Sequence, residues 1–491
     1  MVNGVMNSQL YSISPIEVGI IHFIGIGGIG MSGMAEILKN LGYQVQGSDI
    51  SDSYVTERLE KLGITIFIGH KEENVKDAAI IVRSTAINPF NPEIIAAKNL
   101  NIPIIKRSEM LAEIMRFKHC IAVSGTHGKT TTTSLVAKML EEAGLNPTVI
   151  NGGIINELGT NARLGSGKFL VAEADESDGT FISIPAFVAV VTNIDPEHLD
   201  YYGSFENAKD AYFKFIENLP FYGFGVLCFD HETVREIAAR VTNRLIVSYG
   251  INNKNADLVA VNINQALEKI TFDVKISETL QKHLKIDFNE IKDIKLSISG
   301  EHNLLNSLAA VAVALKLNIS KELIQKGLST FQGVKRRFTK VAEINGISII
   351  DDYAHHPIEI KATLKTARKI ADDKGSKVIA IAQPHRYSRL KDLMDEFSAC
   401  FKEADTLYIS EVYPAGEEPI NGIDSQALVQ NIKKTTGQEV YLLPDHNQIA
   451  SILKSTIQPN DLIIFLGAGN VTKWAYQLPE QLANLQKIKV A

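Results

Sequence analysis

The 491-residue chain has little cysteine: the three residues are Cys120, Cys228 and Cys400. They lie far apart, and the first two fall in apolar runs typical of strands. We therefore expect reduced core residues in a cytoplasmic protein, without disulfides or a cysteine metal site. An excess of positive charge is also missing, because the net charge is -6 and the pI is about 6.1. Nucleic-acid phosphates are bound by basic surfaces, so we expect no nucleic-acid binding.

Long apolar runs are absent as well. The stretch GIIHFIGIG is interrupted by glycines well before it could span a bilayer. The first lysine or arginine is Lys39, so no positively charged segment precedes that stretch. We therefore expect no membrane insertion. The hydrophobic content of 45% and the charged content of 22% are ordinary for a globular protein.

The order of apolar and amphipathic segments predicts an α/β protein. Short apolar runs that end in small or polar residues alternate with segments of helical periodicity, which indicates parallel sheets flanked by helices. The length predicts about three domains, and we place them at residues 18–117, 118–331 and 332–491. Within the second domain, residues 254–276 alternate in a way that favours antiparallel strands.

A glycine-rich turn follows the first predicted strand. Gly25, Gly27 and Gly30 form G-x-G-x-x-G with Gly28 between them, and Asp49 ends the next strand. Such glycines let a backbone approach a pyrophosphate, while the acid reaches a ribose. Taken alone, the motif indicates an NAD-dependent dehydrogenase, although a turn that is merely close-packed is the alternative.

A second glycine loop, GTHGKTT, follows the strand that begins the second domain. Its backbone N–H groups can surround phosphates, Lys129 can neutralise them, and Thr130 can hold Mg²⁺. The usual P-loop spacing would put glycine where this chain has Val123, so the loop is a shortened variant.

Acidic residues and a histidine end the two strands that follow. We expect Glu173 to bind a metal ion because it ends a strand beside the phosphate loop. Glu176 and Asp178 are expected to be solvated loop residues. For His198, a ligand, a helix cap and a packed side chain all stay open.

The motifs GTHGKTT, EADESDG, TNIDPEHLD, GEHNLLN, GVKRRF and DDYAHHP, in this order, resemble the Mur ligase family of ATP-dependent amide-forming enzymes. GIGGIGMSG, QPHRYSR and EVYPAGEEP extend the resemblance from about Gly25 to Asn470. It implies a Rossmann-like N-terminal domain for a UDP-sugar, a central P-loop ATPase-type domain with a mixed sheet, and a Rossmann-like C-terminal domain for an amino acid.

Within the family, the motifs favour a member that uses ATP and Mg²⁺ to join L-alanine to UDP-N-acetylmuramate in peptidoglycan synthesis, as a monomer or weak homodimer. A recycling ligase that attaches a whole peptide to the same UDP-sugar is the nearest alternative. A dehydrogenase and a nucleotide-gated binding protein without chemistry are more distant ones.

The resemblance also implies roles for individual residues. Catalysis is assigned to Lys129, Glu173, His198 and His355, and the metal ion to Thr130, Glu173 and His198. The UDP-sugar site comprises Gly25, Gly27, Gly28, Gly30 and Asp49. The ATP site comprises Gly125, Thr126, His127, Gly128, Lys129, Thr130, Thr131, Asn303, Asn306, Arg337 and Asp352. The amino-acid site comprises Tyr353, His355, His385, Arg386 and Arg389. The family commonly has Asp before the motif histidine, where this chain has Glu197.

Overall fold

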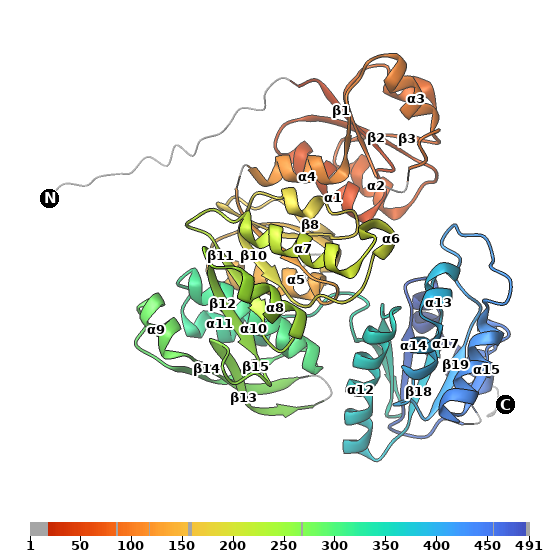
Figure 1. Ribbon diagram of the computed structural model, residues 1–491. Helices are drawn as coiled ribbons and strands as arrows, with labels where there is room; N and C mark the ends of the chain where they lie inside the picture. The colour runs from red at the N-terminus through yellow and green to blue at the C-terminus, as the bar shows by residue number, and fades with distance from the viewer. Residues whose placement is uncertain are drawn as a thin grey trace.

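The computed structural model describes residues 18–84, 87–116, 118–155, 160–266, 269–454 and 456–487. Within these residues the strands form three sheets, one in each successive part of the chain, with helices around each sheet (Figure 1). The predicted α/β class with three such units is confirmed. Two predicted domain ends, Phe117 and Ala491, lie outside the described residues, and the exact limits stay a prediction. No described helix is long and apolar enough to cross a membrane.

The N-terminal sheet is parallel, with the order β3-β2-β1-β4-β5. Its strands are β1 (Ile20–Ile24), β2 (Gln44–Asp49), β3 (Thr65–Ile68), β4 (Ala78–Arg83) and β5 (Ile104–Lys106). Its helices are α1 (Ile29–Asn40), α2 (Tyr54–Lys61), α3 (Pro92–Asn99) and α4 (Arg107–Arg116). The strand order reverses beside β1, so the first glycine loop lies at the topological switch point where such sheets bind ligands.

The central sheet has the order β15-β14-β13-β12-β11-β10-β6-β9-β7-β8. Its strands are β6 (His119–Ser124), β7 (Thr148–Ile155), β8 (Thr160–Arg163), β9 (Phe169–Glu173), β10 (Ala186–Val191), β11 (Phe224–Cys228), β12 (Leu245–Gly250), β13 (Leu258–Gln265), β14 (Ile270–Ile276) and β15 (Glu290–Leu296). The predicted antiparallel excursion is confirmed by the pair β13 and β14, and β15 adds a further antiparallel strand. The antiparallel pair β7 and β8 at the other end is an addition that the sequence did not indicate.

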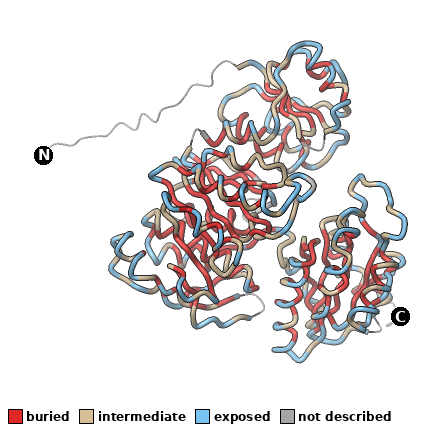
Figure 2. The backbone as a smooth tube through the Cα atoms, in the orientation of Figure 1, coloured by how far each residue is buried: buried red, intermediate tan, exposed pale blue. Residues whose placement is uncertain are grey.

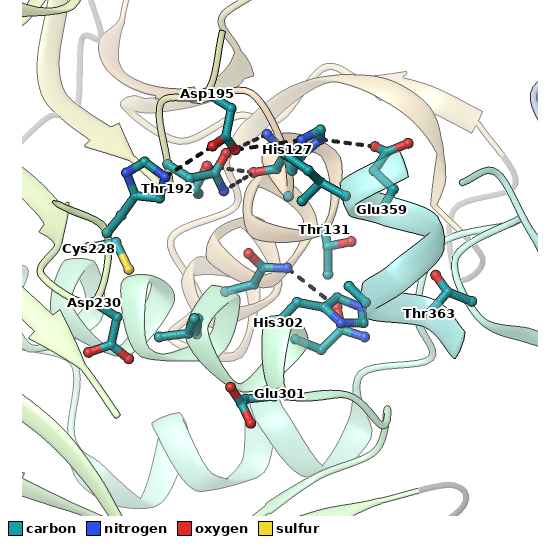
Figure 3. A pocket seen from close by; sticks show the side chains of 18 of the residues that line it. His127, Thr131, Thr192, Asp195, Cys228, Asp230, Glu301, His302, Glu359 and Thr363 are labelled. Atoms are coloured by element: carbon teal, nitrogen blue, oxygen red, sulfur yellow. Dashed lines mark hydrogen bonds and ion pairs between the residues drawn. The ribbon is translucent and has the colours of Figure 1, made fainter. Parts of the chain in front are cut away.

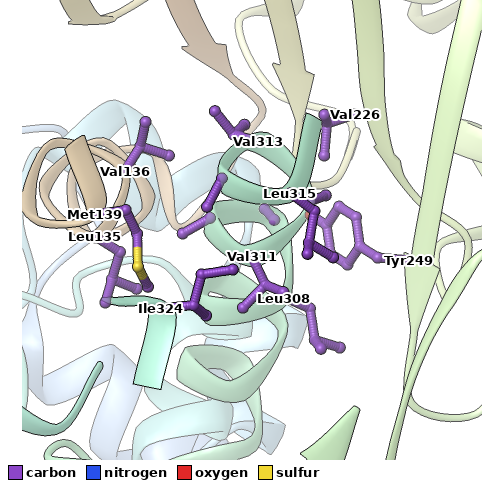
Figure 4. Packing of buried hydrophobic residues seen from close by; sticks show 14 of the residues in the cluster. Leu135, Val136, Met139, Val226, Tyr249, Leu308, Val311, Val313, Leu315 and Ile324 are labelled. Atoms are coloured by element: carbon purple, nitrogen blue, oxygen red, sulfur yellow. The ribbon is translucent and has the colours of Figure 1, made fainter. Parts of the chain in front are cut away.

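Helices on both faces complete the central unit. They are α5 (Lys129–Glu142), α6 (Leu199–Tyr202), α7 (Phe205–Glu217), α8 (Glu232–Arg240), α9 (Glu278–Leu284), α10 (Glu301–Lys316) and α11 (Lys321–Thr330). Buried residues concentrate in the sheet and on the helix sides that face it (Figure 2). Leu135, Val136 and Met139 of α5 pack beside Leu308 and Val311 of α10 (Figure 4). Because α10 is buried on nearly all sides and packs against α5, it supports the second glycine loop from below the start of α5.

The third sheet has the order β16-β17-β21-β18-β19-β20 and is parallel except for the edge strand β16. Its strands are β16 (Thr339–Ile344), β17 (Ile347–Asp352), β18 (Val378–Ala382), β19 (Thr406–Ile409), β20 (Val440–Leu442) and β21 (Leu462–Leu466). Its helices are α12 (Pro357–Lys374), α13 (Tyr387–Asp392), α14 (Met394–Ala399), α15 (Ser425–Thr436), α16 (Ile449–Leu453) and α17 (Val471–Lys487). The carboxyl ends of β17 and β18 carry the motifs DDYAHHP and QPHRYSR.

Candidate functional site

The second glycine loop lies between β6 and α5, where close packing requires glycine twice. Gly125 has φ +130, and an added Cβ would lie 2.1 Å from Thr192 Oγ1. Gly128 has φ +85, and an added Cβ would lie 2.5 Å from Asn306 Oδ1. Side chains at these positions would combine backbone strain with a clash. The loop is therefore held against the end of β10 and against α10. Thr126 Oγ1 accepts the Asp195 N–H at 2.8 Å.

Lys129 begins α5 and folds back onto its own loop. Its Nζ donates to the carbonyl oxygens of Gly125 at 2.7 Å and Thr126 at 3.1 Å. It also donates to Glu176 Oε1 at 2.8 Å. Burial lowers the pKa of Lys129, but nearby carboxylates, above all Glu176, outweigh burial and raise that pKa. A fixed positive charge is therefore present where the loop ends.

Glu173 ends β9 directly beside the loop. Thr130 Oγ1 donates to Glu173 Oε2 at 2.9 Å, and the Gly152 N–H donates to the same oxygen at 2.8 Å. Hard divalent cations prefer oxygen ligands. Thr130 and Glu173 thus present adjacent oxygen atoms at the start of α5.

A second cluster of ligand-bearing side chains consists of Glu176, Glu197 and His198, whose potential ligand atoms all lie within 4.8 Å of one another. The expectation that Glu176 is a solvated loop residue is wrong, because it is only 4% exposed. Its Oε1 pairs with Lys129, and its buried Oε2 has no hydrogen-bond partner among the described residues. Asp178 is partly exposed, and its Oδ1 accepts the Thr180 N–H at 3.1 Å.

His198 occupies the N-cap position of α6 with a left-handed backbone, φ +55. Its Nε2 lies 4.0 Å from Glu197 Oε2. The cluster thus joins His198 to Glu176 and Glu197, whereas the contacts of Glu173 are with Thr130 and Gly152. Glu176 and Glu197 were not among the predicted metal ligands, although they lie in the motifs EADESDG and TNIDPEHLD.

A cavity of about 330 Å³ lies between the central and third units (Figure 3). This volume lies within the range of small-molecule sites. Several predicted ATP-site residues line it: His127, Gly128, Thr131, Asn303, Asn306, Arg337 and Asp352. The sequence did not single out His302, Asp230, His231 or Glu359, which also line it. Burial lowers the pKa of His302 to about 4, so its ring is neutral at pH 7.

The two predicted asparagines lie on α10 at the cavity. Asn303 Nδ2 donates to the Ser299 carbonyl at 2.6 Å, and Asn306 Nδ2 lies 3.4 Å from Asn303 Oδ1. Both side chains are buried. The donors and acceptors of these amides that remain unused can therefore form hydrogen bonds with a polar ligand, and the rigid helix holds them in place.

Asp352 and Arg337 line the cavity from the side of the third unit. Asp352 accepts the N–H groups of Phe338 at 2.7 Å and Ala354 at 2.8 Å. Burial raises its pKa to about 6. The guanidinium of Arg337 lies over the Tyr353 ring, 5.3 Å from its centroid. These contacts hold the entry into β16 and the exit from β17 side by side.

The predicted amino-acid residues form an aromatic and basic cluster after β17 and β18. The centroid of the His355 ring lies 5.1 Å from that of Tyr353 and 5.6 Å from that of His385. Tyr413, which the sequence did not indicate, stacks on His385 at 5.4 Å. Burial lowers the pKa values of His355 and His385 to about 4.

Of the two arginines in QPHRYSR, Arg386 is the N-cap of α13 and Arg389 lies within that helix. Arg386 has φ +71, an uncommon backbone conformation for a residue with a side chain. Arg389 Nη1 is buried and has no hydrogen-bond partner among the described residues. This N–H group can therefore donate a hydrogen bond to an anionic group.

The first glycine loop is closed by its own acid. Gly27 donates its N–H to Asp49 Oδ2 at 2.8 Å, and Gly25 donates to the Ser48 carbonyl at 2.8 Å. Gly28 precedes α1 as its N-cap. These contacts fix the turn and bring Asp49 to the loop instead of leaving it free in solvent.

Arg107, which sequence reasoning missed, reaches this loop from the start of α4. An added Cβ on Gly30 would lie 2.7 Å from Arg107 Nη1. Arg107 Nη2 also pairs with Asp175 Oδ2 at 3.1 Å. The guanidinium therefore connects the first glycine loop with the segment that carries Glu173 and Glu176. Its sequence position after a short strand gave only a weak signal.

Three family models match successive parts of the chain. The model described as "Mur ligase family, catalytic domain" matches residues 20–119, "Mur ligase middle domain" matches 123–314, and "Mur ligase, glutamate ligase domain" matches 336–469.

Named relatives agree with these matches. The UDP-N-acetylmuramate–L-alanine ligase of Brucella anthropi is 54% identical over 473 residues, which cover 96% of this chain and 99% of that one. The solved UDP-N-acetylmuramate-alanine ligase of Thermotoga maritima has a TM-score of 0.78 and 29% identity, covering 95% and 99% of the chains. A murein peptide ligase of Psychrobacter arcticus, with a TM-score of 0.70, 24% identity and 95% and 99% coverage, shares the fold.

Proposed function

The chain belongs to the Mur ligase family, and on that premise we propose that it is the ATP-dependent ligase that joins L-alanine to the carboxylate of UDP-N-acetylmuramate. The observation that carries the proposal is the 54% identity, over 96% of this chain, to the UDP-N-acetylmuramate–L-alanine ligase of Brucella anthropi. The site is consistent with this chemistry, because a phosphate loop with a fixed lysine lies beside carboxylates and near a basic, aromatic cluster.

Two glycine loops serve two different phosphate-bearing substrates in this proposal. The first loop, with Gly25, Gly27, Gly28, Gly30 and Asp49, holds the diphosphate of the UDP-sugar. The second loop holds the phosphates of ATP, and the cavity beside Asn303, Asn306 and Asp352 holds the rest of the nucleotide. Both loops precede a helix N-terminus, where backbone N–H groups and the helix dipole favour anions.

Mg²⁺ fits two sets of side chains in the site. Thr130 and Glu173 offer adjacent oxygen atoms, and Glu176, Glu197 and His198 form the second set. The buried Glu176 Oε2, which has no hydrogen-bond partner among the described residues, is an acceptor that a cation would satisfy. Magnesium bound there would supply positive charge for phosphate oxygens.

The proposed reaction activates a carboxylate before the amide forms. The substrate carboxylate attacks the terminal phosphorus of ATP, ADP leaves, and an acyl phosphate results. Lys129 and Arg337 stabilise the negative charge that develops on the phosphoryl oxygens. The alanine amine then attacks the acyl carbon, loses a proton, and phosphate departs. Enclosure between units excludes the water that would hydrolyse the acyl phosphate.

His355 is suited to orient the amine. Its Nδ1 lies 3.0 Å from the Tyr353 carbonyl, which can only accept, so Nδ1 carries the proton. The neutral ring therefore has its lone pair on Nε2. Because burial lowers the His355 pKa to about 4, the ring is a weak base at pH 7. We assign to it the acceptance of a hydrogen bond from the amine.

Arg389 is the proposed anchor for the amino-acid carboxylate, which would provide the acceptor that its buried Nη1 lacks among the described residues. Arg389→Gln is expected to raise the KM for L-alanine about 10-fold to 100-fold, the range for losing a charged hydrogen bond, with little change in the KM for ATP. Steady-state phosphate release gives both constants. Arg368→Gln, which removes an arginine of α12 that pairs with Asp372 and Asp405, is the matched control. Equal rises in both KM values would contradict the assignment.

Phosphate release that requires UDP-N-acetylmuramate and is fastest with L-alanine tests the proposed function directly. The cytoplasmic location and the state as a monomer or weak homodimer stay predictions.

A further inference from the structure

Glu359 lies in the first turn of α12, where half of its carboxylate serves its own helix. Its Oε2 accepts the backbone N–H groups of His355 at 3.2 Å and His356 at 3.4 Å. The second of these bonds completes a capping box with His356 at the N-cap. A helix of the third unit thus needs an acceptor here, and a neutral amide could provide it.

The other half of the carboxylate contacts a different unit. Glu359 Oε1 lies 3.3 Å from Nδ1 of His127, which is 232 residues away in the chain. The same oxygen lies 3.8 Å from Arg337 Nη1. Figure 3 shows His127 between Asp195 of the central unit and Glu359 of the third. A capping role alone does not account for this contact.

His127 belongs to the second glycine loop, and hydrogen bonds of its backbone hold it there. The backbone N–H of His127 donates to Asn193 Oδ1 at 2.7 Å, and the backbone carbonyl of His127 accepts hydrogen bonds from Thr192 Oγ1 at 2.6 Å and Asn193 Nδ2 at 3.0 Å. Because these bonds fix the backbone between Thr126 and Gly128, a force on the ring is transmitted to the loop that binds phosphates.

Charge supports the contact. Burial raises the pKa of Glu359, but its other contacts, among them the hydrogen bond with His127 and the positive charge of Arg337, outweigh burial and hold that pKa well below its usual range. Burial lowers the pKa of His127, whereas Glu359 above all raises it, with a net rise. Separating a buried carboxylate from the partners that it contacts on both sides of an interface is costly.

We propose that Glu359 is a positioning residue that joins the phosphate loop to the amino-acid cluster, so that nucleotide and amino acid strengthen each other's binding. Oε1 reaches His127 on the nucleotide side, while Oε2 lies 3.4 Å from His355 Nδ1 on the amino-acid side. A placement of the third unit that suits one ligand therefore suits the other, and such coupling is reciprocal. The inference rests on the proposed function.

Glu359→Gln tests the proposal because the amide oxygen can keep the helix cap while the charge is lost. The affinity of the full-length protein for a nonhydrolysable ATP analogue is measured by calorimetry with UDP-N-acetylmuramate and Mg²⁺, with and without saturating L-alanine. The wild-type protein is expected to bind the analogue about fivefold or more tightly when L-alanine is present, within the usual range of coupling. In Glu359→Gln this ratio is expected to fall to about 1.

His127→Gln removes the partner and leaves the α12 cap intact, so it carries the test even if Glu359→Gln fails to fold. The ratio of affinities with and without L-alanine is expected to fall to about 1 in His127→Gln as well. In the double variant this ratio is expected to fall no further than in either single variant. Glu322→Gln, an exposed first-turn acid of α11, is the matched control and is expected to keep the wild-type ratio.

If folded Glu359→Gln keeps the wild-type ratio, the proposal is overturned, and the only role left for Glu359 is to cap α12. A wild-type protein without coupling, or separate additive losses in the two single variants, would overturn it too. Failure of the proposed function is distinguishable, because wild-type phosphate release would then show no dependence on L-alanine.

Discussion

Lys129→Ala is expected to lower L-alanine-dependent phosphate release by about 1000-fold or more, while the affinity for UDP-N-acetylmuramate changes by no more than about twofold, since the UDP-sugar belongs to the first glycine loop. The lysine is the charge of the phosphate loop: its Nζ lies 2.7 Å from the Gly125 carbonyl and 2.8 Å from Glu176 Oε1. The alanine side chain has neither the positive charge nor the hydrogen-bond donors that stabilise phosphoryl oxygens. Phosphate release and calorimetric titration with the UDP-sugar give the two quantities.

The control for this variant is Lys326→Ala. Lys326 also pairs with a carboxylate, Glu142 Oε2 at 2.9 Å, but it is exposed on α11, away from the loop. It is expected to leave both quantities unchanged. Loss of UDP-sugar binding in a folded Lys129→Ala protein would contradict the division of the two loops between two substrates.

Glu173→Gln is expected to lower kcat about 100-fold or more and to raise the Mg²⁺ concentration needed for half-maximal rate. The amide oxygen of Gln can still accept the bonds from Thr130 and Gly152, so the local structure should persist. The variant lacks the negative charge that a divalent cation requires. Rates measured across a magnesium titration separate the two effects.

Glu206→Gln is the control, because Glu206 is an exposed acid of the same unit that pairs with Lys209 at 3.0 Å. It is expected to leave the magnesium dependence unchanged. An unaltered magnesium dependence in Glu173→Gln would show that this carboxylate does not take part in cation binding.

The sequence predicted what depends on local pattern. The strand before GTHGKTT follows from an apolar run, and the structure has β6 there. The alternation in residues 254–276 likewise indicated antiparallel strands, found as β13 and β14. Glycines at 125 and 128 fit because their neighbours leave no room for Cβ.

The contacts that the sequence did not predict join distant segments. The sequence indicates a solvated acid at Glu176 because nothing nearby in the chain buries it, and its partner Lys129 precedes it by 47 residues. Glu359 looks like an ordinary first-turn acid until the fold brings His127 to it. Arg107 reaches Asp175 across 68 residues. Such pairs depend on how the units pack, which no local periodicity encodes.

The central claim is tested most directly by phosphate release from the purified protein with ATP, Mg²⁺ and UDP-N-acetylmuramate, across single amino acids and the recycled tripeptide. The account predicts release that requires the UDP-sugar and is fastest with L-alanine. Release with the tripeptide alone, or release that does not depend on the UDP-sugar, would contradict it.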